Sequence, residues 1–250
     1  MPSRDRVTTS GTMIAINTTL ARRRGRLILL SAGLFGVLAL LAVEINSWWM
    51  TALDTSVWNW FDAHRSHRGQ GDSVGVFSYI GQPVHVAIAG VVGGTLLSLR
   101  ARSVMRLVVV TGTVGAGAVI EQTLKAVVER TPQNLHQLRT GSMVDWSILD
   151  SYAHSFPSGH VTGSATLFGT VAVCLGIGRS RTARVAISGA AVAGVLAVSL
   201  LALYVRAHIF TDVIGGMVLG GALVALGATA IVSATPSEAD TPKTPRGSRM

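Results

Sequence analysis

Residues 22–43 read RRRGRLILLSAGLFGVLALLAV, a cluster of arginines followed by an uncharged apolar run. A run of this length can cross about 30 Å of hydrocarbon as a helix. The arginines and the run together resemble the start of a signal peptide. However, no convincing small-residue cleavage site precedes Glu44, and more apolar runs follow. We therefore predict a retained signal anchor.

Further apolar runs recur along the chain, each long enough to form a membrane-crossing helix. With the first run, at 26–45, they occupy residues 76–99, 104–122, 161–178, 184–205 and 209–233. Because a spanning segment must satisfy its own backbone hydrogen bonds, runs of this length fit helices. The sequence predicts an all-α fold, a polytopic bundle of six transmembrane helices.

The segments that flank these runs have a different composition. Residues 1–25 and 234–250 are polar and rich in Ser, Thr, Pro and Arg, so they cannot bury enough apolar surface to fold alone. We predict disordered tails on both sides of one membrane domain at 26–233, with the chemical motifs within 121–216.

The overall composition excludes most soluble classes. The 250 residues are 49% hydrophobic and only 13% charged, about half the charged fraction of a typical soluble protein. The net charge of +9 comes largely from basic clusters between the apolar runs, where they face cytoplasm and anionic lipid. We predict the lipid bilayer as a partner and no nucleic acid, while the oligomeric state stays open.

The distribution of basic residues predicts the orientation, because cytoplasmic loops carry the excess of Lys and Arg. With the N-terminus inside, 15 of the 21 basic residues fall on the cytoplasmic side. The long loops at 46–75 and 123–160 then lie outside, together with all five tryptophans, as interface anchors do. We expect cytoplasmic N- and C-termini and an extracytoplasmic site in a cell membrane.

The stretch Phe156-Pro157-Ser158-Gly159-His160 stands directly before the fourth apolar run. Pro157 and Ser158 suit the first turn of a helix, and Gly159 lets an anion approach the free N–H groups there. His160 can donate a proton to a leaving oxygen near neutral pH. The alternative is an ordinary helix cap followed by an interfacial histidine.

Two further patterns fall on the same outer side. His208 and Asp212 are four residues apart at the start of the last run, so the carboxylate can hold one ring nitrogen and leave the other as a nucleophile. Lys125 and Arg130 follow the third run and could bind phosphate oxygens. Alternatively, the first pair is a buried hydrogen bond between helices and the second is a solvated basic pair.

The order of these three patterns resembles the type-2 phosphatidic acid phosphatase superfamily of lipid phosphate phosphatases. The resemblance covers about residues 104–233 and includes Tyr204 before the His208 pattern and Gly215-Gly216 after it. The layout of six spans also matches the membrane members of this family.

The resemblance implies catalytic roles for three residues. His208 would be the nucleophile that forms a phosphohistidine, and Asp212 would orient it and stabilise its positive charge. His160 would protonate the leaving group and then activate water. The family needs no metal ion, so we expect neither a metal nor another cofactor.

The resemblance also implies a phosphate-binding set of Lys125, Ser158 and Gly159. The family's first motif, however, has an Arg-Pro pair seven and eight residues after its lysine, where this chain has Pro132 and Gln133. Arg130 is the nearest substitute for the missing arginine.

The third motif departs from the family as well. The family has a Ser-Arg pair that ends six residues before the nucleophile, where this chain has Leu201 and Ala202. Arg206 and the loop residue Arg139 are further cations that could supply the charge. Arg206 is only two residues from His208, so we expect it to point toward a different helix face.

The resemblance implies an integral membrane phosphatase that acts on a lipid phosphate or a polyprenyl (pyro)phosphate at the outer face. Family members act on phosphatidic acid, phosphatidylglycerophosphate and polyprenyl pyrophosphate, and the residues do not choose among them. The Arg-, Ala-, Val- and Gly-rich composition is typical of a bacterial chain from a GC-rich genome, which favours an intermediate of cell-envelope assembly.

Other hypotheses stay open at this point. A catalytically degenerate membrane scaffold could bind lipid phosphate or a partner, and a phosphotransferase could pass the phosphoryl group to an acceptor other than water. A channel or transporter is least favoured, because broken helices and paired half-repeats are not evident. Loop 133–155 is either a lid or head-group reader, or a solvated connector.

Overall fold

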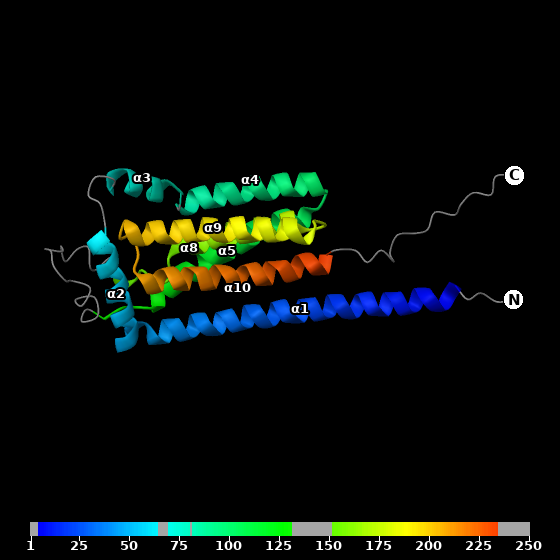
Figure 1. The fold of residues 1–250 in the computed structure, drawn as a ribbon, viewed down its shortest axis with the longest axis horizontal. Helices are drawn as coiled ribbons and strands as arrows, with labels where there is room; N and C mark the ends of the chain where they lie inside the picture. Colours follow the sequence, from blue (N-terminus) through cyan, green and yellow to red (C-terminus); the bar gives the residue numbers. More distant parts are fainter. Residues whose placement is uncertain (1–4, 65–69, 81, 132–151, 235–250) are drawn as a thin grey trace.

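The computed structural model describes residues 5–64, 70–80, 82–131 and 152–234, and they form helices without strands. The long helices run side by side as an antiparallel bundle (Figure 1). They are α1 (Asp5–Val43), α4 (Pro83–Ala101), α5 (Val104–Val127), α8 (Gly159–Gly176), α9 (Arg181–Tyr204) and α10 (Phe210–Ala234). The prediction of an all-α fold is confirmed.

Two shorter helices close one end of the bundle. Helix α2 (Trp48–His64) lies across that end, and α3 (Gln70–Ile80) lies beside α4 and α9. The start of α1 and the end of α10 lie at the other end (Figure 1). The four tryptophans of α2 therefore lie at the end of the bundle opposite the start of α1 and the end of α10. Trp48 and Trp60 are exposed there.

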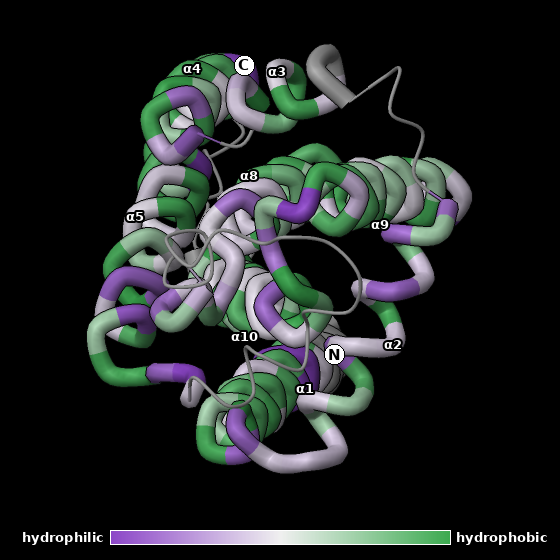
Figure 2. Tube along the Cα trace, turned by 90° about the vertical axis from the view of Figure 1, so that its left-hand side faces the viewer, coloured by the Kyte–Doolittle hydropathy of each residue, from purple (hydrophilic) through white to green (hydrophobic). Residues whose placement is uncertain are grey.

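Helices α8 and α10 form the centre of the bundle, with α1, α4, α5 and α9 around them (Figure 2). Small residues let the helices pack closely. On α5, a Cβ added to Gly117 would lie 3.3 Å from the methyl groups of Thr162 and Thr166 on α8. The outer helices instead expose apolar side chains, such as Leu29, Val91 and Val185. An apolar outer surface of this kind fits a hydrocarbon environment.

Within the described residues, five helical segments are long and apolar enough to cross a membrane: Thr18–Asn46, which includes most of α1, and the helices α4, α5, α9 and α10. Helix α8 is not among them. It has only 18 residues and carries His160 together with several Ser and Thr side chains, which lowers its hydropathy although it lies at the centre of the bundle.

The second predicted run, at 76–99, is divided between two helices. Helix α3 ends at Ile80, and α4 begins at Pro83, which occupies its first turn. Proline has no N–H to continue a helix from the preceding turn, but its fixed φ suits a helix start. The segment predicted as a loop at 46–75 is also largely helical, because it contains α2 and the start of α3.

Helix α1 begins at Asp5 and so extends over most of the segment predicted to be a disordered tail at 1–25. Once a stable apolar helix exists, adding residues to its end costs little, because the unfavourable step is nucleation. Of the C-terminal tail, residues 235–250 lie outside the described residues.

Candidate active site

The start of α10 brings His208 and Asp212 together. Nδ1 of His208 lies 3.4 Å from Oδ2 of Asp212, and the N–H of Ile209 donates to the same oxygen over 3.3 Å. Asp212 is fully buried and His208 is 8% exposed. Because Nδ1 faces the carboxylate, Nε2 is the ring nitrogen left to face the site.

Arg130 is brought to the same carboxylate from the segment after α5. Its Nη2 donates to Oδ1 of Asp212 over 2.6 Å and to Oγ1 of Thr211 over 2.7 Å. The side chain is 3% exposed, and among the described residues its Nε and Nη1 have no hydrogen-bond partner. Arg130 thus joins the site through Asp212 and keeps buried donors available.

Asp54 of α2 is a site residue that the sequence analysis missed. Its carboxylate accepts from the N–H and the Oγ1 of Thr211, both over 2.8 Å, and lies 3.9 Å from Nη2 of Arg130. Burial raises the pKa of Asp54 to about 6. Because residues 46–75 were predicted to be a loop, this aspartate had no sequence signal that separated it from a solvated one.

The segment before α8 forms a turn with an anion-accessible backbone. Ser158 is the N-cap, with its Oγ accepting from the N–H of Val161 and its carbonyl accepting from the N–H of Thr162. Its own N–H donates to the carbonyl of Asp212 over 2.9 Å, which ties the turn to α10. Since the first N–H groups of a helix lack intrahelical partners, those of Gly159 and His160 remain to bind an anion.

The two glycines of α10 explain how this turn packs so closely. The ring of Phe156 lies directly over Gly215. A Cβ on Gly216 would lie 2.7 Å from the carbonyl oxygen of Ser158. The Gly215-Gly216 pair therefore lets α10 approach the backbone of the turn, which a larger residue would push away.

His160 faces His208 across the site. Their ring centroids are 6.0 Å apart, and the His160 ring stacks on Phe77 of α3 with centroids 4.2 Å apart. His160 and Phe77 also line a cavity of about 400 Å³ with Gln82. Phe77 is a second residue that sequence reasoning missed, because an aromatic residue in an apolar run carries no functional signal.

Lys125 lies in the last turn of α5 and forms an ion pair with Glu121, one turn earlier, over 2.5 Å. Lys125 is partly exposed, whereas the Glu121 side chain is only 6% exposed. The carboxylate of Glu121 reaches the backbone of Gly159. The structure therefore connects Lys125 to the Ser158–Gly159 turn through a residue that the sequence analysis did not single out.

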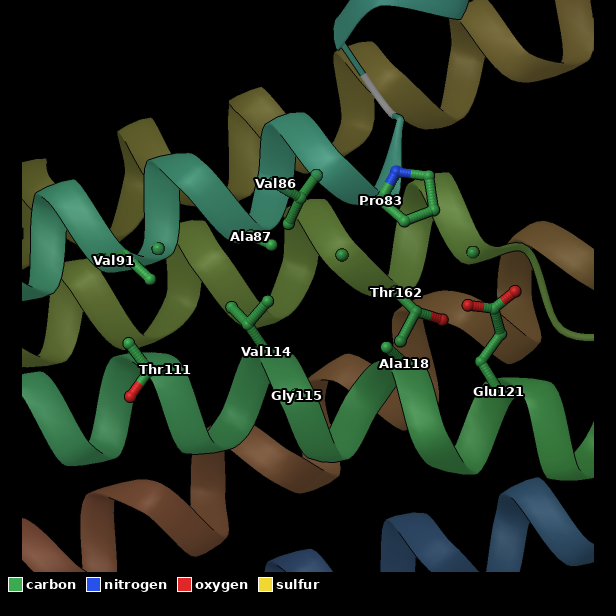
Figure 3. A pocket seen from close by; sticks show the side chains of 13 residues that line it. Pro83, Val86, Ala87, Val91, Thr111, Val114, Gly115, Ala118, Glu121 and Thr162 are labelled. Atoms are coloured by element: carbon green, nitrogen blue, oxygen red, sulfur yellow. The ribbon is translucent and has the colours of Figure 1, made fainter.

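A narrow apolar pocket of about 160 Å³ leads to this point between α4, α5 and α8 (Figure 3). Its walls include Val86, Val91, Val114 and Ala118, and Glu121 and Thr162 lie toward one end with Gly159. The pocket thus combines an apolar interior with a polar end at the predicted phosphate-binding turn.

The guanidinium of Arg206 is directed to α2 rather than to Asp212, although Arg206 and His208 line one small pocket. Arg206 adopts a positive φ of 59° just after α9, and its guanidinium pairs with Asp62 and lies 4.6 Å from the ring centroid of Trp58, both on α2. Ala202 is fully buried among apolar side chains, while Arg139 and Pro132 lie outside the described residues.

Within residues 5–64, 70–80, 82–131 and 152–234, no group of three His, Cys, Asp or Glu side chains could hold a metal ion. His208 lies beside Asp212 and faces His160, with the basic side chain of Arg130 nearby.

Comparisons with known proteins identify a matching family and a similar solved structure. The sequence model of the PAP2 superfamily matches residues 103–235. The chain is similar to the crystal structure of a transmembrane PAP2-type phosphatidylglycerolphosphate phosphatase from Bacillus subtilis, with 20% identity and a TM-score of 0.62. The match covers 79% of this chain and 93% of that chain. A search of curated proteins finds no match.

Proposed function

Because this chain belongs to the PAP2 superfamily, we propose that it is an integral membrane phosphatase that hydrolyses a lipid phosphate or a polyprenyl (pyro)phosphate. The observation that carries this proposal is the placement of the His208–Asp212 pair opposite His160, with 6.0 Å between the histidine ring centroids. The two rings approach edge to face, so both imidazoles belong to one site, where a phosphoryl group on one histidine would be within reach of the other.

In the first step, Nε2 of His208 attacks phosphorus and the bond from phosphorus to the leaving oxygen breaks. His160 donates its proton to that oxygen, so an alcohol or a phosphate leaves and a phosphohistidine remains. Asp212 holds Nδ1 of His208 and stabilises the positive charge that develops on the ring. The buried Arg130 fixes the other oxygen of Asp212.

In the second step, His160 acts as a base and removes a proton from water. The water oxygen attacks phosphorus, the bond from phosphorus to Nε2 breaks, and inorganic phosphate leaves. The chain's own acid, base and nucleophile complete this cycle, so we propose that it needs neither a metal ion nor another cofactor.

Phosphate oxygens would be bound by the first turn of α8 and by nearby cations. The N–H groups of Gly159 and His160 suit an anion, and Ser158 shapes the turn. Lys125 approaches from α5. Nε and Nη1 of Arg130, which have no hydrogen-bond partner in the part of the chain that the structure describes, are further buried donors. We propose that Arg130, rather than Arg206, replaces the missing family arginine, since Arg206 is engaged by α2.

We propose that α8 crosses the membrane with the five apolar helices, which makes six spans within a domain at 26–233. Its central place between α4, α5, α9 and α10 supports this. Most basic residues belong to the end of the bundle where α1 begins and α10 ends. This excess supports cytoplasmic N- and C-termini and an extracytoplasmic site in a cell membrane. The tryptophans of α2 would then lie at the outer interface.

The apolar pocket between α4, α5 and α8 supports a lipid substrate. A tail in this pocket would bring its phosphate toward Gly159, where the pocket ends. The similar Bacillus subtilis structure is of a phosphatidylglycerolphosphate phosphatase, which makes that lipid one of the substrates to test. A polyprenyl pyrophosphate of a bacterial cell envelope is the other class that we propose.

Phosphate release from a lipid panel tests the proposal. Detergent-purified protein would be assayed without added metal on phosphatidic acid, phosphatidylglycerophosphate and polyprenyl pyrophosphate. Release should disappear in His208→Ala and persist in His64→Ala, a control in an exposed histidine at the end of α2. A folded wild type that releases phosphate from none of them would favour the degenerate scaffold instead.

A further inference from the structure

The carboxylate of Glu121 lies where an anion would meet the first turn of α8. A Cβ built on Gly159 would be 2.5 Å from Oε1 and 2.8 Å from Oε2 of this side chain. The carboxylate therefore rests directly against the Gly159 backbone. Glu121 is 5% exposed, so protein rather than solvent surrounds it.

Glu121 also has a cationic partner, Lys125, with Nζ 2.5 Å from Oε1. A lysine ammonium and the positive end of a helix are the two features that favour a bound phosphate. In this structure the ammonium of Lys125 pairs with the carboxylate, and the carboxylate lies against Gly159, the first residue of α8. Glu121 thus has the surroundings of the phosphate that the site is proposed to bind.

We propose that Glu121 is a displaceable counter-anion of the phosphate site; this inference rests on the function proposed above. Without substrate, its carboxylate neutralises Lys125 and covers the first turn of α8. When a lipid phosphate arrives, its oxygens replace the carboxylate at Lys125 and at the Gly159 backbone. Glu121 is therefore a residue that sets the affinity of the site, and with it which anions bind tightly enough to occupy it.

The charge of the ligand decides whether this exchange is favourable. A phosphate monoester carries a charge of about −1.5 to −2 at pH 7, whereas the carboxylate carries one negative charge. The phosphodiesters of the surrounding bilayer also carry only one. The cost of displacing Glu121 is the same for every anion, so it keeps weak and abundant phosphodiesters out while monoesters and pyrophosphates still bind.

The position of Glu121 along the lipid path strengthens this role. The carboxylate lies toward the polar end of the apolar pocket, beside Thr162 (Figure 3). A lipid whose tail occupies the pocket must bring its head group past this carboxylate to reach Gly159. The head group of every lipid that enters by this route must therefore displace the carboxylate of Glu121.

Calorimetric titration with inorganic phosphate tests the proposal without requiring turnover. Glu121→Gln keeps the size of the side chain and removes its charge, so phosphate should bind about tenfold more tightly than to wild type, as expected for losing one charge-assisted contact. With an active lipid substrate, KM should fall by a similar factor and kcat should stay within about twofold. Phosphatidylglycerol micelles should inhibit this variant and not the wild type.

Two matched variants separate displacement from a general charge effect. Glu129→Gln removes the same charge from an exposed residue just after α5, and phosphate affinity should change less than about twofold. In a Lys125→Met background, Glu121→Gln should improve phosphate binding by a smaller factor, because one of the two contacts for which the carboxylate and the phosphate compete is then gone. If Glu121→Gln does not fold, Glu121→Asp, which is one methylene shorter, should shift the affinity in the same direction.

Unchanged or weaker phosphate binding by a folded Glu121→Gln would overturn the proposal and make Glu121 a structural partner of Lys125. The absence of phosphate binding by wild type and by every variant would overturn it as well. If phosphate binds as expected and no lipid is hydrolysed, the proposed function fails while the role of Glu121 in anion binding stands.

Discussion

Arg130 and Asp212 form a buried ion pair in which Nη2 of the arginine lies 2.6 Å from Oδ1 of the aspartate, with side chains 3% and 0% exposed. The other oxygen of the same carboxylate lies 3.4 Å from Nδ1 of His208. One carboxylate therefore connects a cation from the end of α5 to the proposed nucleophile at the start of α10. A substitution of Arg130 therefore affects His208 through one side chain, that of Asp212.

Arg130→Gln should lower kcat by at least about 100-fold, because it removes preorganised positive charge and leaves Asp212 without its partner. Arg206→Gln should lower kcat less than about tenfold, since its guanidinium is paired with Asp62 on α2. Steady-state phosphate release by the two variants gives the comparison. A larger loss in Arg206→Gln would show that Arg206 supplies the charge instead.

Asp54 should make stability depend on pH. Burial raises the pKa of this carboxyl to about 6 in the folded protein, whereas in the unfolded chain it ionises near 3.8, the ordinary value of an aspartate. Between these values the unfolded state binds fewer protons, so the free energy of unfolding falls as pH rises from about 4 to about 6.

Thermal unfolding followed by tryptophan fluorescence checks this dependence. Asp54→Asn should flatten the fall between about pH 4 and 6, whereas Asp62→Asn, on the same helix but more exposed, should keep it. Stability that falls equally steeply in Asp54→Asn would show that another group is responsible.

Gly216→Ala should reduce activity strongly, because the added Cβ would lie 2.7 Å from the carbonyl of Ser158 and displace the turn that holds Gly159 and His160. We expect at least a tenfold loss of kcat/KM. Gly112→Ala on α5 is the matched control, since nothing lies within 4 Å of its added Cβ. Equal activities of the two variants would mean that the close approach of α10 does not position the turn.

Phe77→Leu should lower kcat by up to about tenfold and leave KM nearly unchanged, because it removes the ring on which His160 stacks while keeping an apolar side chain. Tyr79→Leu is the control: Tyr79 lies 4.3 Å from the ring centroid of His85, outside the proposed site. A loss that appears in KM rather than in kcat would assign Phe77 to substrate binding.

The apolar runs predicted the long helices because the spacing and length of such runs carry the signal of a membrane helix directly. Local motifs also placed His208, Asp212 and the Ser158–Gly159 turn at neighbouring helix ends. The break at Pro83 was missed because hydropathy continues across it, although proline marks the start of α4. Helix α2 was missed because its polar residues resemble those of a loop.

Residues that enter the site only through tertiary contacts could not be predicted in the same way. Asp54 reaches Thr211 over 157 positions of sequence, and no local pattern records such a contact. Glu121 was one turn from Lys125, and this i, i+4 spacing predicts an ion pair. Its contact with Gly159, however, depends on how α5 packs against α8.

The central claim is that His208 becomes phosphorylated during turnover, and mass spectrometry of the trapped enzyme tests it most directly. His160→Ala lacks the base that activates water, so incubation with a polyprenyl pyrophosphate, which has a good leaving group, and quenching in alkali should leave a phosphoryl group on His208. The same treatment of His160→Ala combined with His208→Ala should leave none. A phosphoryl group on another residue, or none in a variant that still releases phosphate, would contradict the account.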